Sequence, residues 1–263
     1  MYGAVLDSLS PEAVVPRLRG RFGRPYDHVG STPSTQLLIA ADAPEGALVA
    51  AEEQTKGRGR LGRRWLAPYG TSLLCSLQLR PDVPSGRLPE LTGVAAQAVA
   101  ETVAAVADLE PELKFPNDVL AGGRKLAGVL IELGGEFLGP CHAVIGIGVN
   151  LRLPADVVAA IDQPVTDIAA LTGADPPSRN RLAGRLLARL IETLDRFAGH
   201  GFAAISADYA RADLLRGNAV RVTAADGARD GIAEGVDSRG ALRVRHGDTI
   251  TLYDSAEVTV RAR

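Results

Sequence analysis

Five cations lie within nine positions of the segment EEQTKGRGRLGRRW, residues 52–65. They are Lys56, Arg58, Arg60, Arg63 and Arg64, and they alternate with Gly57, Gly59 and Gly62. Glycine lets the backbone approach a ligand closely and arginine offers a planar fork of donors, so the pattern suits an anion with several oxygens. It is not a Walker loop, because GxxxxGK[ST] is absent. The segment alone leaves three interpretations open: a phosphate-binding loop, a nucleic-acid arm and a solvated turn.

Three later segments also carry residues that could do chemistry. KFPNDV (114–119) gathers a lysine, an amide and a carboxylate at one turn, although Asn and Asp also stabilise turns without a function. RKLAGVLIEL (124–133) places Lys125 at the entrance of an apolar strand with Gly128 beside it; an edge lysine that guards the strand is the alternative. GIGVN (146–150) is an apolar strand with two glycines that ends in Asn150, and by itself it is a weak signal.

Composition limits what these residues can serve. The chain has 263 residues and a formal net charge of -2, so no global basic field attracts nucleic acid, and one large domain or a medium domain plus a small one is expected. Cys75 and Cys141 lie in apolar stretches without metal-ligand spacing, which favours buried reduced thiols. With no long apolar segment at the N-terminus or elsewhere, the sequence predicts a cytoplasmic protein without membrane partners.

The elements that must position these residues follow from hydrophobic periodicity. The sequence predicts long helices over 88–109 and 179–198, shorter helical runs over 10–18, 36–41 and 202–212, and a turn over 116–123. Strands are expected over 46–54, 71–79, 112–115, 124–133 and 141–151, followed after Arg216 by five short strands with glycine turns. This order predicts an α+β fold: a mixed β-sheet catalytic domain flanked by helices over residues 1–212, and a small C-terminal β-barrel over 213–263.

In their order along the chain, GRGRLGRRW, KFPND, RKLAGVLIEL and GIGVN resemble the biotin protein ligases, and the resemblance extends over about residues 26–263. It implies a sheet of the class II synthetase and biotin–lipoate ligase kind with an SH3-like barrel. Phe115 stands where the family usually has Trp. The family's Ser-Thr-Asn has two candidates, STP (31–33) and STQ (34–36), and we favour the second because Gln36 keeps an amide.

The resemblance implies a reaction in two steps. Mg-ATP activates biotin to biotinyl-5′-AMP with release of pyrophosphate, and biotin then passes to a lysine of a biotin carboxyl carrier protein of a carboxylase. The implied catalytic residues are Lys125, Lys114 and Arg60. Those implied for biotin are Ser34, Thr35, Gln36, Gln54, Gly57, Arg58, Trp65, Lys125 and Gly128. Those implied for ATP are Arg60, Arg63, Trp65, Lys114, Asn117 and Asn150, and Asp118 either holds Mg²⁺ or orients Lys114.

Two other functions compete with this one. A lipoate or octanoate ligase or transferase would share the fold and the acyl-adenylate chemistry, whereas a nucleic-acid-binding module would use only the Arg/Gly loop. The short stretch ahead of the core predicts a monofunctional ligase without a winged-helix domain or repressor activity. The sequence leaves a homodimer open.

Overall fold

A mixed β-sheet forms the centre of the molecule. The computed structural model describes residues 8–135, 141–224, 227–254 and 259–262. In it, the large sheet has the strand order β1-β2-β4-β8-β7-β6-β5, with β3 paired to β2. Its strands are β1 (Tyr26–Thr32), β2 (Leu48–Arg58), β3 (Arg64–Ala67), β4 (Ser72–Leu79), β5 (Glu112–Lys114), β6 (Asp118–Ala121), β7 (Arg124–Gly135) and β8 (Cys141–Asn150). Only the β1–β2 pair is parallel, and the other pairs are antiparallel.

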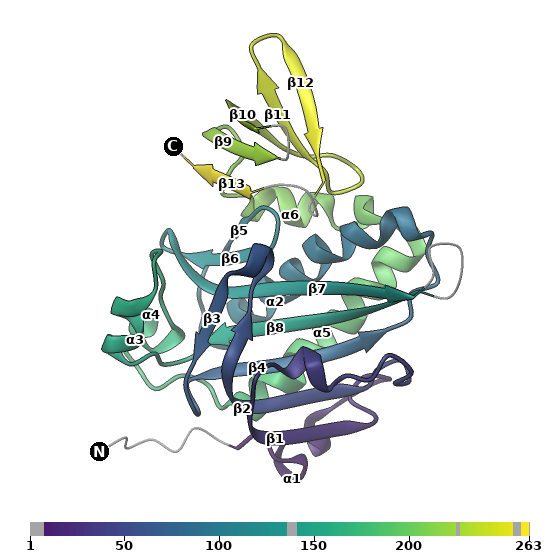
Figure 1. Ribbon diagram of the computed structural model, residues 1–263, viewed down its shortest axis with the longest axis vertical. Coiled ribbons are helices and arrows are strands. Elements are labelled where there is room, and N and C mark those ends of the chain that lie inside the picture. Colours follow the sequence, from purple (N-terminus) through teal and green to yellow (C-terminus); the bar gives the residue numbers. More distant parts are fainter. Residues whose placement is uncertain (1–7, 136–140, 225–226, 255–258, 263) are drawn as a thin grey trace.

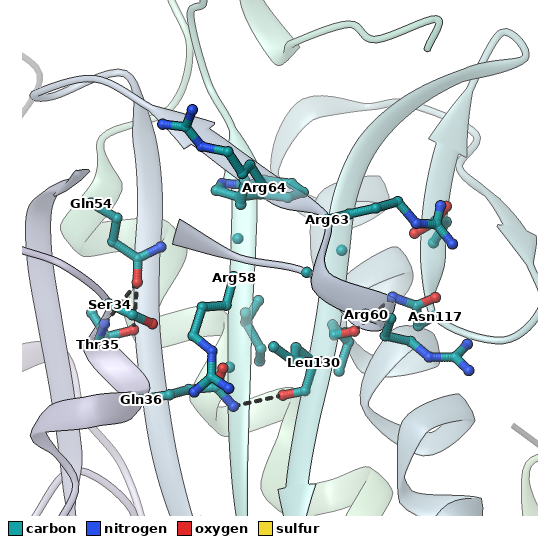
Figure 2. A pocket seen from close by; sticks show the side chains of 18 of the residues that line it. Ser34, Thr35, Gln36, Gln54, Arg58, Arg60, Arg63, Arg64, Asn117 and Leu130 are labelled. Atoms are coloured by element: carbon teal, nitrogen blue, oxygen red, sulfur yellow. Dashed lines mark hydrogen bonds between the residues drawn. The ribbon is translucent and has the colours of Figure 1, made fainter. Parts of the chain in front are cut away.

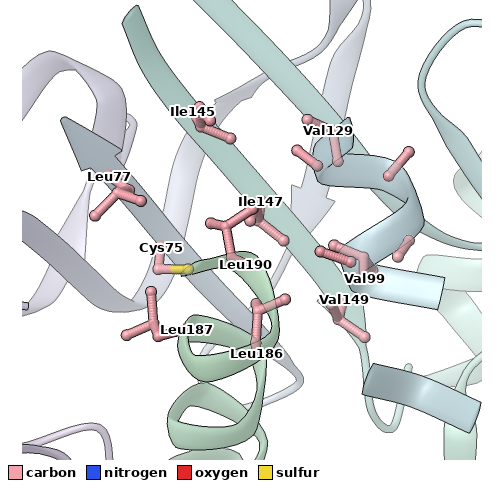
Figure 3. Close-up of a cluster of buried hydrophobic side chains, with 14 of the residues drawn as sticks. Cys75, Leu77, Val99, Val129, Ile145, Ile147, Val149, Leu186, Leu187 and Leu190 are labelled. Carbon is pink, nitrogen blue, oxygen red and sulfur yellow. The ribbon is translucent and has the colours of Figure 1, made fainter. Parts of the chain in front are cut away.

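Two long helices cover one face of this sheet (Figure 1). They are α2 (Leu91–Ala107) and α5 (Arg179–His200). Helix α2 is rich in alanine and ends at Asp108, whose φ of 52° is the left-handed conformation common after a helix. Figure 3 shows how their apolar side chains meet those of the sheet, with Leu186, Leu187 and Leu190 of α5 against Cys75 and Ile147. The shorter helices are α1 (Pro11–Val14), α3 (Ala155–Ala160), α4 (Ile168–Thr172) and α6 (Ser206–Ala212). No helix of the described residues is long and apolar enough to span a bilayer.

At its centre, the opposite face of the sheet carries glycines, because successive residues of a strand point to opposite faces. On β8, Ile145, Ile147 and Val149 belong to the core under the helices, so Gly146 and Gly148 between them fall on the open face. Register places Gly148 opposite Gly128 of β7 and Gly146 opposite Leu130. The result is a strip of backbone without side chains across the two central strands.

A two-stranded ribbon lies in front of this open face (Figure 1). Strand β2 continues beyond its pairing with β4 and turns back as β3, with Gly57 opposite Trp65 and Arg58 opposite Arg64. The turn at its tip, Arg60–Gly62, contains Leu61 at a φ of 56° and Gly62 at 73°. We call residues 54–67 the β2–β3 ribbon. It carries all five cations of the glycine-rich segment. Four of them line the pocket between this ribbon and the sheet, and Lys56 does not.

A second, five-stranded antiparallel sheet follows α6. Its order is β12-β11-β10-β9-β13, formed by β9 (Ala219–Ala224), β10 (Gly227–Val236), β11 (Leu242–His246), β12 (Thr249–Tyr253) and β13 (Thr259–Ala262). It has its own apolar core, separate from the core beneath the large sheet. The expected small C-terminal β unit is therefore confirmed, while its SH3-like topology stays a prediction.

Most expected elements are present, and the differences cluster near the open face. Residues 36–41 were expected to be helical, but only a 3₁₀ turn, Thr35–Leu38, forms there. The expected turn over 116–123 contains β6, and β1 forms over Tyr26–Thr32, where no strand was expected. Cys75 is buried, as expected, and Cys141 is half-buried. Tertiary pairing overrides local propensity at these places.

A buried charge cluster fixes β2 just before it leaves the sheet. Glu52 is 2% exposed; its Oε1 accepts from the Leu9 N–H at 2.9 Å and lies 3.0 Å from His28 Nε2, and its Oε2 accepts from Arg179 of α5. Burial alone would raise the pKa of Glu52, but these bonds, from Leu9 first and then Arg179 and His28, keep the pKa below its ordinary value. The cluster ties the N-terminal segment, the sheet and α5 together two residues from Gln54.

We expect Arg179→Ala to lower the free energy of unfolding by about 3–5 kcal/mol, because it leaves a buried carboxylate without its charge partner. Urea unfolding at pH 7 measures the loss, and Arg185→Ala on an exposed position of the same helix is the control, with a change within about 0.5 kcal/mol. Since the folded pKa of Glu52 is the lower one, wild-type stability from this group is lost as the pH falls through the acidic range. The variant should lose less on acidification; a loss under about 1 kcal/mol at pH 7 would contradict the role of the pair.

Candidate functional site

A pocket lies between the β2–β3 ribbon and the glycine strip of the large sheet (Figure 2). Of the residues that the sequence nominated, twelve line it: Ser34, Thr35, Gln36, Gln54, Arg58, Arg60, Arg63, Trp65, Asn117, Asp118, Lys125 and Gly128. They come from four separate stretches of the chain, and Gly146, Ile147 and Gly148 of GIGVN line the pocket as well. The pocket therefore joins all four sequence motifs in one place.

Trp65 of the ribbon lies directly on the glycine strip. A Cβ atom added to Gly148 would come within 2.6 Å of the Trp65 ring, and one added to Gly128 within 3.1 Å. Both distances are too short for any larger residue to replace glycine without moving the indole. The indole N–H of Trp65 is buried and has no hydrogen-bond partner among the described residues. A buried donor of this kind is one to which a ligand can supply an acceptor.

Short polar side chains form a hydrogen-bonded chain at one end of the pocket. Gln54 Oε1 accepts from Thr35 twice, from the backbone N–H at 2.7 Å and from the hydroxyl at 3.1 Å. The Thr35 hydroxyl also lies 2.7 Å from Ser76 Oγ of β4. Because these bonds fix the carbonyl oxygen of Gln54, its amide NH₂ remains as a donor for a ligand. Ser34 lines the pocket beside them.

Gln36 lies over the third glycine of the strip. Its side-chain NH₂ donates to the Leu130 and Val144 carbonyls, both at 3.3 Å, and a Cβ on Gly146 would come within 2.9 Å of its amide carbon. Ser31, by contrast, lies on the edge strand β1. It donates to Glu53 of β2 and does not line the pocket. This geometry favours the STQ register, residues 34–36, over STP, residues 31–33.

The ribbon's arginines face the pocket from above. Arg58 forms a forked ion pair with Glu132 of β7, with nitrogen–oxygen distances of 2.7 and 3.1 Å, so it bridges the ribbon and the sheet. Burial lowers the pKa of Arg60, the nearby charge of Arg63 lowers it further, and Asp118 acts in the opposite direction. Two neighbouring cations, one of them half-buried, gain free energy when an anion binds between them.

The other end of the pocket carries an ion pair. Lys125 Nζ lies 2.6 Å from Asp118 Oδ1 and 5.5 Å from the centre of the Trp65 ring, and both charged side chains are largely shielded from water. The sequence suggested Lys114 or Mg²⁺ as partners of Asp118, and the structure gives it Lys125. Asn117 next to it is fixed by its NH₂, which donates to the Val129 carbonyl at 2.8 Å.

Three nominated residues do not line the pocket. Gly57 lies behind Trp65, where a Cβ would come within 2.4 Å of the Trp65 carbonyl oxygen. Lys114 lies opposite Asp118 in the β5–β6 register, one strand beyond the lining. Asn150 is buried, and its NH₂ donates to the Thr166 carbonyl at 3.0 Å. Its contact is thus with the segment that flanks Lys125, since Thr166 N–H donates to the Lys125 carbonyl.

The structure also adds residues that the sequence did not nominate: Gly59, Arg64, Val129, Leu130, Gly146, Ile147, Gly148 and Gln163. The alternating glycines of GIGVN were a usable signal for Gly146 and Gly148. Gln163 had none, because its loop is brought to the pocket by backbone hydrogen bonds of Lys125 with Pro164 and Thr166, which no local pattern predicts. Within the described residues, no three His, Cys, Asp or Glu side chains form a metal-binding group, and Asp118 is the one acidic residue of the lining.

Known proteins share this arrangement. Residues 30–150 match the family described as the biotin/lipoate A/B protein ligase family. The chain is 36% identical over 246 residues to the biotin–[acetyl-CoA-carboxylase] ligase of Mycobacterium tuberculosis, covering 89% of this chain and 88% of that protein. It is 32% identical to the bifunctional ligase/repressor BirA of Bacillus subtilis, covering 89% of this chain and 72% of that protein.

A solved structure agrees with these relatives. The biotin protein ligase from Aquifex aeolicus in complex with biotin and ATP superposes with a TM-score of 0.79 and 28% identity, covering 90% of this chain and 99% of that one. An α+β ligase domain with a small β-sheet unit is therefore the class that fold and pocket define. The chain belongs to the biotin protein ligases of the biotin/lipoate A/B protein ligase family.

The glycine strip makes a direct prediction about Trp65, which is the single tryptophan of the chain. Gly148→Ala should displace the indole, because the new methyl group would lie 2.6 Å from the ring. We expect a shift of the tryptophan emission maximum and stronger quenching by acrylamide in the protein without ligands. Gly30→Ala, at a glycine with no atom within 4 Å of the added Cβ, is the control. Identical emission and quenching in both variants would show that Trp65 does not rest on Gly148.

Proposed function

We infer that the protein is a biotin protein ligase, which activates biotin with ATP to biotinyl-5′-AMP and transfers biotin to a lysine of a carrier protein. The observation that carries this inference is the ion pair Lys125–Asp118 at one end of a pocket whose other end is neutral and polar, with arginines above. Such a pocket suits a ligand with an uncharged polar head and a carboxylate tail beside a phosphate. We propose that residues 1–212 perform both steps and that residues 213–263 form a separate unit.

The first step brings two anions together. An oxygen of the biotin carboxylate attacks the α-phosphorus, and the bond from this phosphorus to the pyrophosphate oxygen breaks, so negative charge accumulates on the phosphate oxygens. We propose that Lys125 lies between carboxylate and α-phosphate, with Arg60 and Arg63 on phosphate oxygens. Positioned cations remove the repulsion without a proton transfer from the protein. Asp118 orients Lys125 through an ion pair at 2.6 Å.

The polar end of the pocket fits the ureido ring of biotin. That ring has both donors and acceptors, and we propose that it binds Ser34, Thr35 and the NH₂ of Gln54, with Arg58 beside them. The sulfur-containing ring and the aliphatic tail then lie on the strip of Gly128, Gly146 and Gly148, against Trp65 and Gln36. Because Trp65 and Gln36 contact these glycines in the protein without ligands, both side chains must move aside for biotin to reach the backbone.

ATP is proposed to enter as its magnesium complex. Its adenosine lies at the end formed by Asn117 and the segment held by Asn150, with Lys114 and Trp65 flanking the phosphate. Magnesium is usually bound through substrate phosphates and one or two carboxylates, so one acidic lining residue, Asp118, is enough on the protein side. In the second step, the carrier lysine attacks the acyl carbon and AMP leaves; we propose that Lys114, next to Asp118 and outside the lining, stabilises that charge.

The acceptor is proposed to be the biotin carboxyl carrier protein of an acyl-CoA carboxylase, in keeping with the name of the 36% identical relative. No nucleic acid is needed to explain the cation cluster, since Arg58 pairs with Glu132 and Arg60 and Arg63 face the pocket. Lipoate and octanoate lack the ureido ring for which Ser34, Thr35 and Gln54 form a partner. They are accordingly the substrates to test against biotin.

The direct test is ATP–pyrophosphate exchange with biotin, lipoate or octanoate added one at a time. We expect exchange with biotin and little with the other two acids, because only biotin satisfies the polar end of the pocket. Trp65 emission should also change on addition of biotin. Exchange supported by lipoate and not by biotin would overturn the proposal.

The role of Lys125 gives a second prediction. Lys125→Gln should lower the exchange rate at saturating substrates by about 10²–10³-fold, as expected for loss of one preorganised group that stabilises charge in the transition state. Lys56→Gln is the matched control, because it removes a lysine of the β2–β3 ribbon that is exposed and outside the lining. It should change the rate less than about threefold. Comparable rates for both variants would remove Lys125 from the catalytic centre.

A further inference from the structure

Phe115, the aromatic residue of KFPND, belongs to the large domain but is buried in the core of the small C-terminal sheet. Its side chain is 3% exposed and belongs to the apolar cluster of the small sheet. Among the described residues, the other buried members of that cluster all come from residue 215 onward: Leu215, Val220, Val222, Ala233, Leu242, Val244, Tyr253 and Val260. The large domain thus contributes one buried side chain to the core of the small unit.

The backbone on either side of this residue is held as well. Leu113 of β5 forms a parallel bridge with Asp213, and the Leu214 N–H donates to the Leu113 carbonyl at 2.9 Å. The chain that enters the small sheet therefore runs alongside β5 just before Phe115. Backbone hydrogen bonds and side-chain burial together fix Phe115 relative to residues 213–260.

On its other side, Phe115 leads straight into the pocket. Pro116 follows, and then Asn117, whose carbonyl accepts from the Val129 N–H at 3.0 Å and whose NH₂ donates to the Val129 carbonyl. Asp118 comes next and holds Lys125 at 2.6 Å. Only two residues separate a core anchor of the small unit from the charge pair at the reacting end of the pocket.

We propose that Phe115 is a positioning residue through which the small C-terminal sheet fixes Asp118, and with it Lys125, for the adenylation step. The inference rests on the ligase function proposed above. Asp118 is only three positions beyond Phe115, so a displacement of Phe115 is passed along the chain to Asp118, within the limits that its pairing with Lys114 and Gly128 sets. A displacement of about 1 Å at a reacting group can cost about 10²-fold in rate. Residues 213–263 thereby affect catalysis without lining the pocket.

The alternative is that Phe115 only contributes packing. Four variants separate the two roles. Phe115→Ala removes the anchor, and Phe197→Ala is its match: the same truncation at a 1%-exposed phenylalanine of α5 in the other core. Val222→Ala weakens the small core at a residue of β9, within the small sheet itself. Phe115→Leu keeps an apolar side chain of moderate size at position 115. All assays are run at a temperature well below the unfolding transition of every variant.

Two measurements are made on these variants. The first is kcat for biotin-dependent ATP–pyrophosphate exchange, together with the KM values for biotin and ATP. The second is hydrogen exchange of the Val129 amide, which bonds to Asn117, relative to the Cys75 amide on β4, away from the KFPND turn. Hydrogen exchange requires no substrate and so tests the anchor independently of the activity.

We expect Phe115→Ala to lower kcat by about 10–10²-fold and to speed hydrogen exchange of the Val129 amide more than that of the Cys75 amide. Val222→Ala should show a smaller loss of the same kind, and Phe115→Leu should recover most of kcat. Phe197→Ala should lower thermal stability similarly and leave kcat within about threefold. It should speed hydrogen exchange of the Val129 and Cys75 amides alike.

Equal kcat values and equal hydrogen-exchange patterns in Phe115→Ala and Phe197→Ala would overturn the positioning role. Absence of biotin-dependent exchange in the wild-type protein would instead overturn the proposed function. In that case, the Val129 measurement still decides whether the small sheet holds the KFPND turn.

Discussion

The alternation of side chains along β7 and β8 is the constraint on which the rest of the site depends. One face of these strands must fill the core under α2 and α5, and it does so with branched apolar residues such as Ile147 and Val129. The other face carries glycine at Gly128, Gly146 and Gly148, so the indole of Trp65 and the amide of Gln36 can rest on backbone. A shift of register by one residue would place the branched side chains in the pocket and the glycines in the core, with the loss of both.

Above this strip, charge and shape are arranged by separate parts of the chain. The β2–β3 ribbon supplies Trp65 and the arginines, the Ser34–Gln36 turn supplies the neutral polar end, and the KFPND turn supplies Asp118 beside Lys125. The ribbon is held to the sheet by Trp65 on the glycines and by Arg58 on Glu132. Because both contacts involve side chains and no β-ladder with the sheet beneath, the ribbon can adjust to a ligand while the floor stays fixed.

The sequence allowed much of this to be predicted. Long periodic segments gave the two main helices, the β7–β8 pair and the five small strands, because packing and local preference agree there. Motif resemblance gave twelve lining residues, but it could not show that Asp118 pairs with Lys125, or that Asn150 holds the Thr166 segment. Such pairings depend on strand register and on loops that return from distant positions, as with Gln163. The strand β6 and the edge strand β1 were missed for a related reason: polar or turn-prone residues adopt extended structure there once a neighbouring strand offers its hydrogen bonds.

The place of Phe115 has a consequence for the order in which the protein becomes active during its synthesis. The ribosome makes the chain from the N-terminus, and the stretch that carries the pocket, from Ser34 to Gln163, emerges first. The core that encloses Phe115 also contains Val260 on β13, which is made after the whole of that stretch. A nascent chain can therefore expose every lining residue and still lack the support behind Asp118. The support behind Asp118 is complete only after β13 has been made and has paired with β9.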